Sequence, residues 1–561
     1  MTGRVRLIQC LVYIAYFTVW IKLCYWQVYK SRDFRRIASS QYADKVEIKA
    51  PRGKIFSSDG SPLVTNTNIF SVYVDPALFK PSVSDWQKIL DLIPASASAR
   101  ANSEKIINNP DSRWTLLSKN VPLENKRRLE NLSVSGIFFT PDTIRSYPEG
   151  SASAYLTGFV ADDGLGGQQG YFGLEGFYDR QLKGRNGWII QESDVFNSPI
   201  LGGFENSFAE IAGWNLTTSI DRTIQYLALK HLHAGLDKYQ AEAGSVSIIE
   251  SKTGKVLAMV SLPGYDPEKF SQYSTDTYKN PLISDSYEPG STFKPIIMAG
   301  ALDAGVVTPD TICTACTGPV VIGDAQIRSW NNSYYPNSTM PEIILHSDNV
   351  GMVFVSRKLG KTRMLSYIRK FRFGSKTGID LQEEDSPEIK ADNQWFDVDW
   401  ATTAFGQGIA VTRLQLLVAI NTLANKGWYI FPRVVTELKT DRATQSIPLK
   451  KPVRVISEKA ASDMVRMMIN GVENGEVRYY KPKGYLIAGK TGTAQVPISG
   501  HYDPNESVAS FVGFAPADNP LFTMLVTLKN PKSSPWGSTT AAPLWFGLAA
   551  DLFRYYHIIK S

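Results

Sequence analysis

A single long apolar segment near the start of the chain, Leu7–Val28, limits what the remaining residues can fold into. As a helix it would be roughly 33 Å long at ~1.5 Å per residue, which matches the hydrocarbon core of a bilayer. Lys22 lies near its end, where a long side chain can reach the headgroups. A cleaved signal peptide is the alternative, but the basic residues from Lys30 to Arg36 follow without a small-residue cleavage site. We therefore expect an uncleaved membrane anchor.

Composition indicates that the rest of the chain is folded, because 561 residues with 43% hydrophobic content can bury ample core. The net charge of +7 is small for this length and includes no long basic run, which argues against nucleic acid as a partner. The four cysteines exclude a disulfide-rich framework. Cys313 and Cys316 form a lone Cys-x-x-Cys, for which a local disulfide or two plain thiols is favoured over zinc. We expect neither a metal nor a cofactor.

One Ser-x-x-Lys occurs in the chain, at Ser291 and Lys294, just before the apolar run Pro295–Met298. On a helix, positions i and i+3 share a face, so the lysine amine can reach the serine hydroxyl. A serine becomes a good nucleophile only when a neighbour removes its proton, and Lys294 can do so if burial or another cation lowers its pKa. The pattern predicts a nucleophilic serine, although a surface helix start would show the same residues.

Ser-x-Asn occurs three times, and local pattern selects the copy at Ser347 and Asn349. It follows a capping-box pattern that starts at Thr339 and a short apolar helix, and a second helical stretch comes after it. A corner between two helices can hold a hydroxyl and an amide rigidly beside a cleft. The copy at Ser329 lies in a Ser, Asn, Tyr and Pro-rich stretch typical of a loop, and the copy at Ser118 precedes the nucleophile in another part of the chain.

Lys-Thr-Gly also occurs three times, and only the copy at Lys490–Gly492 lies within a predicted strand, 485–494. Gly492 would allow close backbone approach there, and an extended substrate could add to such an edge strand. The copy at Lys252 forms the turn of a predicted hairpin, and the copy at Lys376 is predicted to be a loop.

Together the three motifs resemble, in order and spacing, those of the penicillin-binding protein family. The segment Phe405–Ile409 is similar to the glycine-glutamine-glycine segment of that family. Pro51–Ile55 and Gly170–Glu175 are similar to pedestal signatures of its monofunctional class B branch. The resemblance covers nearly the whole chain. One departure is Ser57-Ser58, which replaces the Asp-Arg pair usual after the Arg-Gly signature.

The resemblance implies a D,D-transpeptidase that cross-links peptidoglycan stem peptides and is acylated by β-lactams. Catalytic roles then fall to Ser291, Lys294 and Ser347. Substrate binding falls to a second set: Asn349, Lys490, Thr491, Gly492 and Thr493. A lipid II polymerase of the SEDS family and division-complex proteins are the implied partners.

The predicted fold class is α+β. Strand-like runs at both ends of 216–561, with helices between them, predict an antiparallel sheet flanked by helices for this transpeptidase domain. The resemblance implies a pedestal domain of mixed structure over 45–215, in which the glycine-rich stretch 164–176 suggests a loop-bound junction. It also implies a cytoplasmic tail over 1–6, the anchor over 7–28 and an extracytoplasmic catalytic domain. The basic residues alone do not orient the anchor, because more follow it than precede it.

Several alternatives stay open. A β-lactamase would need a base for fast deacylation, and no second motif supplies one. A Ser-His-Asp hydrolase fits poorly, because the chain has five histidines and no Gly-x-Ser-x-Gly around Ser291; His346 is better interpreted as a helix-end residue. A noncatalytic scaffold of a wall-synthesis complex would not need three intact motifs. Within the family we favour a division-type (FtsI-type) enzyme over an elongation-type one, since the pedestal is short and no further module follows Tyr556.

Overall fold

The computed structural model describes residues 2–34, 43–94, 115–164, 167–192, 205–498 and 501–560. The chain forms two compact units. The first comprises Met1–Arg52 and Lys183–Gly213, and the second comprises Gly53–Leu182 and Trp214–Ser561.

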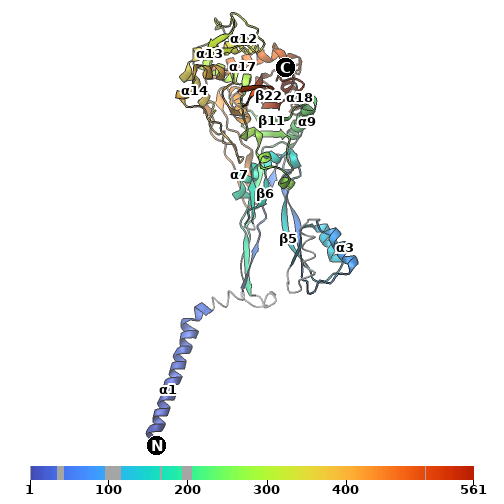
Figure 1. Ribbon diagram of the computed structural model, residues 1–561, viewed down its shortest axis with the longest axis vertical. Helices are drawn as coiled ribbons and strands as arrows, with labels where there is room; N and C mark the ends of the chain where they lie inside the picture. Colours follow the sequence, from blue (N-terminus) through green and yellow to red (C-terminus); the bar gives the residue numbers. More distant parts are fainter. Residues whose placement is uncertain are drawn as a thin grey trace. The chain divides into compact units, whose positions relative to one another are not determined.

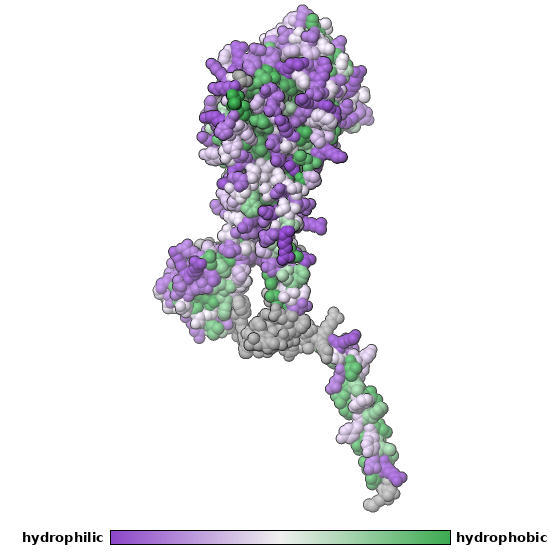
Figure 2. Space-filling view, turned by 180° about the vertical axis from the view of Figure 1, so that it is seen from behind, coloured by the Kyte–Doolittle hydropathy of each residue, from purple (hydrophilic) through white to green (hydrophobic). Residues whose placement is uncertain are grey.

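The first unit contains the predicted apolar helix. Helix α1 (Thr2–Cys24) continues into a π-helical turn, η1 (Tyr25–Tyr29), and the span Gly3–Tyr29 is long and apolar enough to cross a membrane. Its apolar side chains are exposed, and the helix surface in view is largely hydrophobic (Figure 2). The helix thus begins earlier than the predicted Leu7, within the stretch expected to be a tail. The unit also contains an antiparallel sheet of β1 (Ala43–Ile48), β8 (Gly187–Glu192) and β9 (Glu205–Phe208).

The second unit is built around a five-stranded antiparallel sheet in the order β12-β11-β23-β22-β21. Successive residues of strand β22 point to opposite faces of the sheet. Phe511 packs into one hydrophobic cluster and Val512 packs into the other. Helices α9 (Arg222–Tyr239) and α18 (Ala541–Tyr555) cover one face, and a larger group of helices covers the other (Figure 1). This confirms the predicted α+β fold. The strands are β11 (Ala243–Glu250), β12 (Val256–Leu262), β21 (Ala488–Ile498), β22 (His501–Ala515) and β23 (Phe522–Lys529).

Helix α11 (Lys294–Asp303) lies at the centre of the larger helical group, and every residue from Lys294 to Ala301 is buried. A helix that is apolar on all sides belongs inside a protein, which explains why the run after Lys294 has no polar face. The helices that pack directly against α11 are α13 (Asn349–Leu359), α14 (Lys361–Lys370), α16 (Arg413–Ala424) and α17 (Glu458–Glu473). Helices α12 (Met340–Leu345) and α15 (Asp397–Thr403) pack against this layer.

A second, seven-stranded sheet joins residues from both sides of position 215. Strand β2 (Ile55–Phe56) pairs in parallel with β10 (Asn215–Thr218), and β3 (Pro62–Val74) continues the sheet. The predicted boundary between 215 and 216 therefore falls inside one strand, and the domain division stays a prediction. The remaining strands are β4 (Thr115–Pro122), β5 (Ile137–Ser146), β18 (Val435–Lys439) and β19 (Thr444–Ser446).

The glycine-rich stretch 164–176 is more regular than the predicted loop-bound junction. It contains β7 (Gln168–Tyr171), which pairs with β6 (Phe159–Asp162), and then α7 (Gly173–Phe177). Gly173 has φ +47°, and a Cβ there would lie 2.5 Å from the carbonyl oxygen of Leu156. The glycines thus permit close packing of one backbone on another, which local composition does not distinguish from a loop.

Candidate active site

Ser291 and Lys294 lie where the predicted helix starts. Ser291 belongs to a 3₁₀ turn, η5 (Gly290–Phe293), which leads directly into α11 with Lys294 as its first residue. Pro295 follows in the first turn, where its missing N–H leaves no hydrogen bond unmade. The Lys294 side chain is fully buried, whereas Ser291 is only partly buried. The sequence spacing thus places an accessible hydroxyl one turn before a buried amine.

Ser347 and Asn349 occupy the predicted corner between two helices, α12 and α13. Thr339 and Glu342 form the expected capping box at the start of α12, and His346 ends that helix. Ser347 has φ +52°, an unusual conformation for a residue with a side chain. Asp348 then caps α13 by accepting a hydrogen bond from the Val350 N–H at 2.9 Å. The two helix ends therefore fix the backbone that carries both functional side chains.

Lys490–Gly492 lies on β21, which is one of the two edge strands of the five-stranded sheet. A Cβ on Gly492 would come within 2.8 Å of the Thr292 side chain and 2.5 Å of Ser510 Oγ. Only glycine therefore lets β21 pack this closely against η5. The other two copies of the motif have the structures predicted for them, because Lys252 lies in the β11–β12 turn and Lys376 lies in a loop.

The three motifs meet at the Ser347 hydroxyl. Ser347 Oγ lies 3.2 Å from Lys294 Nζ and 3.0 Å from Lys490 Nζ. Lys294 Nζ also donates to Asn349 Oδ1 at 2.9 Å and to the Ser347 carbonyl, and Lys490 Nζ donates to Thr491 Oγ1 at 3.3 Å. Among the described residues, the Ser291 hydroxyl makes no hydrogen bond. The predicted Lys294–Ser291 contact is thus not formed, because the amine is held by the 347–349 corner instead.

Burial changes the acidity of both lysines. It lowers the pKa of Lys294 well below the usual value, and the nearby charge of Lys490 lowers this pKa further, while Asp348 acts in the opposite direction. Burial also lowers the pKa of Lys490 to about 8, and Glu476 opposes that decrease. Two amines that share one hydroxyl repel each other when both are charged. The site therefore favours a neutral Lys294 beside a charged Lys490.

Ser291 lines two adjoining hollows. We name the first the charged hollow, because Lys490 and Glu476 line it together with Ser347 and His346. We name the second the neutral hollow, because the described residues that line it include no Asp, Glu, Lys, Arg or His. Trp330 and Trp536 line both hollows, with ring centroids 5.1 Å apart. Ser291 thus lies where the charged hollow meets the neutral hollow.

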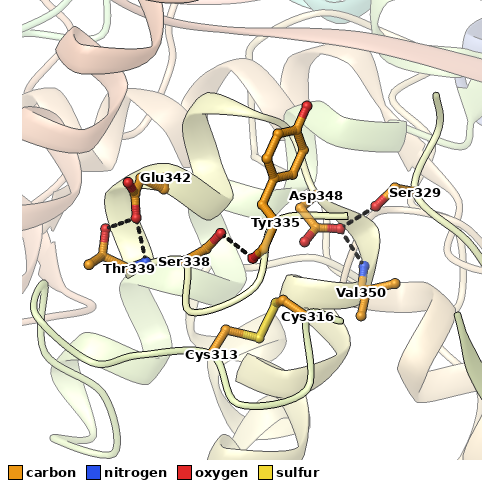
Figure 3. Close-up of a disulfide and its surroundings, with 9 residues drawn as sticks. All are labelled: Cys313, Cys316, Ser329, Tyr335, Ser338, Thr339, Glu342, Asp348 and Val350. Atoms are coloured by element: carbon orange, nitrogen blue, oxygen red, sulfur yellow. Dashed lines mark hydrogen bonds between the residues drawn. A yellow bond between two sulfur atoms is a disulfide. The ribbon is translucent and has the colours of Figure 1, made fainter. Parts of the chain in front are cut away.

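The loop 328–330 supports the 346–349 corner, although the sequence predicted only that this stretch is irregular. Asn349 Nδ2 donates to the Arg328 carbonyl at 3.0 Å, and Trp330 Nε1 donates to the His346 carbonyl at 3.3 Å. Between them, the Ser329 hydroxyl donates to Asp348 Oδ1 at 2.5 Å (Figure 3). These three consecutive residues therefore bind three residues of the corner. Nothing in the local polarity of this stretch signalled such contacts.

The Cys-x-x-Cys lies close to the same loop. Cys313 and Cys316 form a buried disulfide, which Figure 3 shows below Tyr335 and Asp348. The Cys313 N–H donates to the Ser338 carbonyl at 2.8 Å, so the disulfide is linked to the start of α12. Of the possibilities that the sequence left open, the local disulfide is the one observed. Within the described residues, no group of three or more His, Cys, Asp or Glu could hold a metal ion.

Gly406 packs against Gly290 at the start of η5, and replacing Gly406 with alanine is expected to destabilise the protein. Its carbonyl accepts from the Gly290 N–H at 3.0 Å, its φ is +82°, and a Cβ would lie 2.1 Å from the Gly290 carbonyl oxygen. We expect Gly406→Ala to cost about 2 kcal/mol or more, because backbone cannot rotate away from the clash. The midpoint of thermal unfolding measures this loss.

Gly408→Ala is the matched control for that substitution. Gly408 also has a positive φ, of +73°, but its nearest neighbour to a Cβ would be Thr402 Oγ1 at 3.2 Å. The expected cost is about 1 kcal/mol, from the backbone conformation alone. Equal midpoints for the two variants would contradict the proposed packing of Gly406 against Gly290.

Comparison with known proteins agrees with this geometry. The profile for the penicillin binding protein transpeptidase domain matches residues 244–552, and that for the penicillin-binding protein dimerisation domain matches residues 47–218. The chain therefore belongs to the penicillin-binding protein transpeptidase family. Its additional dimerisation domain makes it a class B member of that family.

Individual relatives span most of the chain. It is 29% identical to stage V sporulation protein D of Bacillus subtilis, over 98% of this chain and 85% of that protein. It is also 29% identical to peptidoglycan D,D-transpeptidase FtsI of Escherichia coli, over 91% and 85% respectively. A peptidoglycan synthetase from Bifidobacterium adolescentis superposes with a TM-score of 0.74 at 26% identity, covering 92% of this chain and 98% of that one. Penicillin binding protein 2X from Streptococcus thermophilus shares the fold, with a TM-score of 0.76 at 23% identity and coverage of 91% and 80%.

Proposed function

We propose that the protein is a serine-type D,D-transpeptidase that cross-links peptidoglycan stem peptides through an acyl-enzyme on Ser291. The observation that carries this proposal is the Ser347 hydroxyl, which lies within hydrogen-bond distance of both Lys294 and Lys490. Three motifs from distant parts of the sequence thus converge beside one accessible serine. The printed name of the Escherichia coli relative, a peptidoglycan D,D-transpeptidase, supports the same activity.

Acylation begins with proton transfer to the buried lysine. The neutral Lys294 amine takes the Ser291 proton after a small movement away from its present partners, and Ser291 Oγ attacks the carbonyl carbon between two terminal D-alanines. The C–N bond then breaks, and Ser347 relays a proton to the leaving nitrogen. D-Alanine departs, and the remaining stem peptide is held as an ester on Ser291.

Substrate binding falls to the residues around this centre. The Lys490 ammonium attracts the terminal carboxylate, with the Thr491 and Thr493 hydroxyls as additional donors. Asn349 binds the substrate peptide group, while Gly492 leaves the edge of β21 open to an extended peptide. Backbone N–H groups of Ser291 and Thr493 form the oxyanion hole, where one donor is typically worth about 3 kcal/mol.

The second half of the reaction is attack by an amine of a neighbouring stem. The amine nitrogen bonds to the acyl carbon, the ester C–O bond breaks, and the serine recovers its proton. β-Lactams present a reactive amide to the same serine, so they acylate Ser291 and are released slowly. The proposal thus includes peptidoglycan stem peptides as substrates and β-lactam antibiotics as inhibitors.

Anchor and relatives support a cellular setting for this reaction. The helix Gly3–Tyr29 would cross the cell membrane once, with the catalytic region on the extracytoplasmic side, where stem peptides occur. A membrane-embedded lipid II polymerase of the SEDS family and division-complex proteins would be its partners. Septal wall synthesis is our preferred role, and synthesis of the lateral wall is the alternative. Localisation of a tagged copy to septum or side wall distinguishes them.

The purified full chain in detergent is expected to convert a synthetic stem pentapeptide into cross-linked dimer and free D-alanine. Its penicillin adduct should persist for minutes or longer, because the sequence supplies no second motif for a base that would activate a hydrolytic water. Mass spectrometry of product and adduct measures both results. An adduct that turns over within seconds would instead indicate a β-lactamase. Normal acylation without any cross-linked product would favour a scaffold.

A further inference from the structure

The two hollows at Ser291 differ in a way that bears on which amine the enzyme accepts. Ser347 and Lys490 line only the charged hollow, and Glu476 is the one carboxylate among the described residues that line it. The neutral hollow contains amide and hydroxyl side chains such as Gln407 and Gln495. A charged ligand group therefore has a charged partner on one side of the serine only.

Glu476 is free to bind such a group. It is exposed at the start of η7 (Glu476–Tyr479), just after α17, and makes no hydrogen bond or ion pair with the described residues. By contrast, the neighbouring carboxylate of Glu473 accepts from Lys481 Nζ at 2.6 Å and does not line the hollow. Glu476 is also near enough to Lys490 to influence that amine electrostatically. Glu476 thus lines the same hollow as Ser291, and its carboxylate has no hydrogen-bond or ion-pair partner among the described residues.

The chemistry of the reaction identifies the group that would use it. The attacking nitrogen of the acceptor must approach the acyl carbon from the side on which the D-alanine nitrogen left. Ser347, which is proposed to pass a proton to the D-alanine nitrogen, lines the charged hollow. The acceptor therefore enters through this hollow. An alkyl amine is an ammonium ion at neutral pH, so the Lys490 charge repels it as it enters. A carboxylate at the same entrance offsets that repulsion.

We propose that Glu476 is a specificity-determining residue that attracts the ammonium group of the acceptor stem into the charged hollow. This inference rests on the proposed transpeptidase function. The bound ammonium releases one proton to solvent, and the neutral amine attacks the Ser291 ester. The C–N bond forms and the C–O bond breaks, while the second proton passes from the nitrogen through Ser347 to Ser291 Oγ.

The test compares acceptors of different charge, with the full chain in detergent and a stem pentapeptide as donor. Glu476→Gln is expected to raise the KM for a lysine-containing stem tripeptide about fivefold, the effect typical of a partly exposed ion pair. The KM for hydroxylamine, a neutral nucleophile at neutral pH, should not change. Added salt should raise the KM for the tripeptide in the unmodified protein but not in the variant, because salt screens the attraction.

Two further variants provide the controls. Glu476→Asp retains the charge and should restore most of the tripeptide KM, whereas Glu473→Gln removes a carboxylate that lies outside the hollow and should leave it unchanged. An unaltered tripeptide KM in Glu476→Gln, with normal penicillin acylation, would overturn the role of Glu476 alone. Failure of the unmodified protein to be acylated would instead overturn the proposed function. Equal increases for the tripeptide and hydroxylamine would also reject the inference, because charge would then not be what is recognised.

Discussion

Replacing Ser291 with alanine is expected to abolish covalent labelling by fluorescent penicillin and to lower the rate of stem-peptide cross-linking by about 10⁴-fold or more. The reason is chemical: the adduct is an ester of Ser291 Oγ, and alanine has no oxygen there. The fold should be unaffected, since that hydroxyl makes no hydrogen bond within the described residues. Gel fluorescence after incubation with the drug, together with the midpoint of thermal unfolding, measures both outcomes.

Ser329→Ala is the informative control, because Ser329 belongs to another copy of Ser-x-Asn and lies close to the same site. Its hydroxyl donates to the buried Asp348 carboxylate, so its loss leaves Asp348 Oδ1 with the Val350 N–H as its one remaining donor among the described residues. We expect slower labelling and a lower unfolding midpoint, with a covalent adduct still formed. Persistent labelling of the Ser291→Ala protein would show that the nucleophile is a different residue.

The copies of the repeated motifs that the structure brings together beside Ser291 are the ones selected from the sequence, because each copy lies in a distinct local pattern. Lys490 lies in the run 485–494 that is predicted to be a strand, and β21 begins within this run at Ala488; Ser347 follows a capping box. Both signals are local in the chain. A capping box needs hydrogen bonds only within a few residues, and the preference of a run for an extended conformation follows from its own residue types.

Contacts between distant residues could not be predicted in the same way. Ser329 and Trp330 bind the corner at Asp348 and His346 through tertiary packing, and their surroundings show only that the stretch is irregular. The pairing of β2 with β10 joins positions far apart in the chain, and no periodicity specifies that neighbour. The absence of a hydrogen bond between Lys294 and Ser291 in this structure has a related reason. Helical spacing brings the Lys294 amine within reach of the Ser291 hydroxyl, but the 347–349 corner supplies better acceptors for that amine.

Substituting Lys294 is expected to have the second largest effect, and two variants separate its possible roles. Lys294→Met removes the base and retains a linear, buried side chain, whereas Lys294→Arg retains a positive charge that does not dissociate near neutral pH. We expect each to lower the second-order rate constant for penicillin acylation about 10³-fold, because neither can accept the serine proton. A Lys294→Arg protein of normal rate would show that the residue supplies charge rather than a base.

The pH dependence of acylation tests the same assignment in the unmodified protein. Lys294 acts as a base only when neutral, so the rate should increase as pH rises through its lowered pKa. Lys490 binds a carboxylate only when charged, so the rate should decrease as pH rises through about 8. In Lys490→Arg the guanidinium stays charged, and the decrease near pH 8 should disappear while the increase at lower pH remains. A decrease that persists in that variant would contradict the division of roles between the two lysines, since some other group would then be losing its proton.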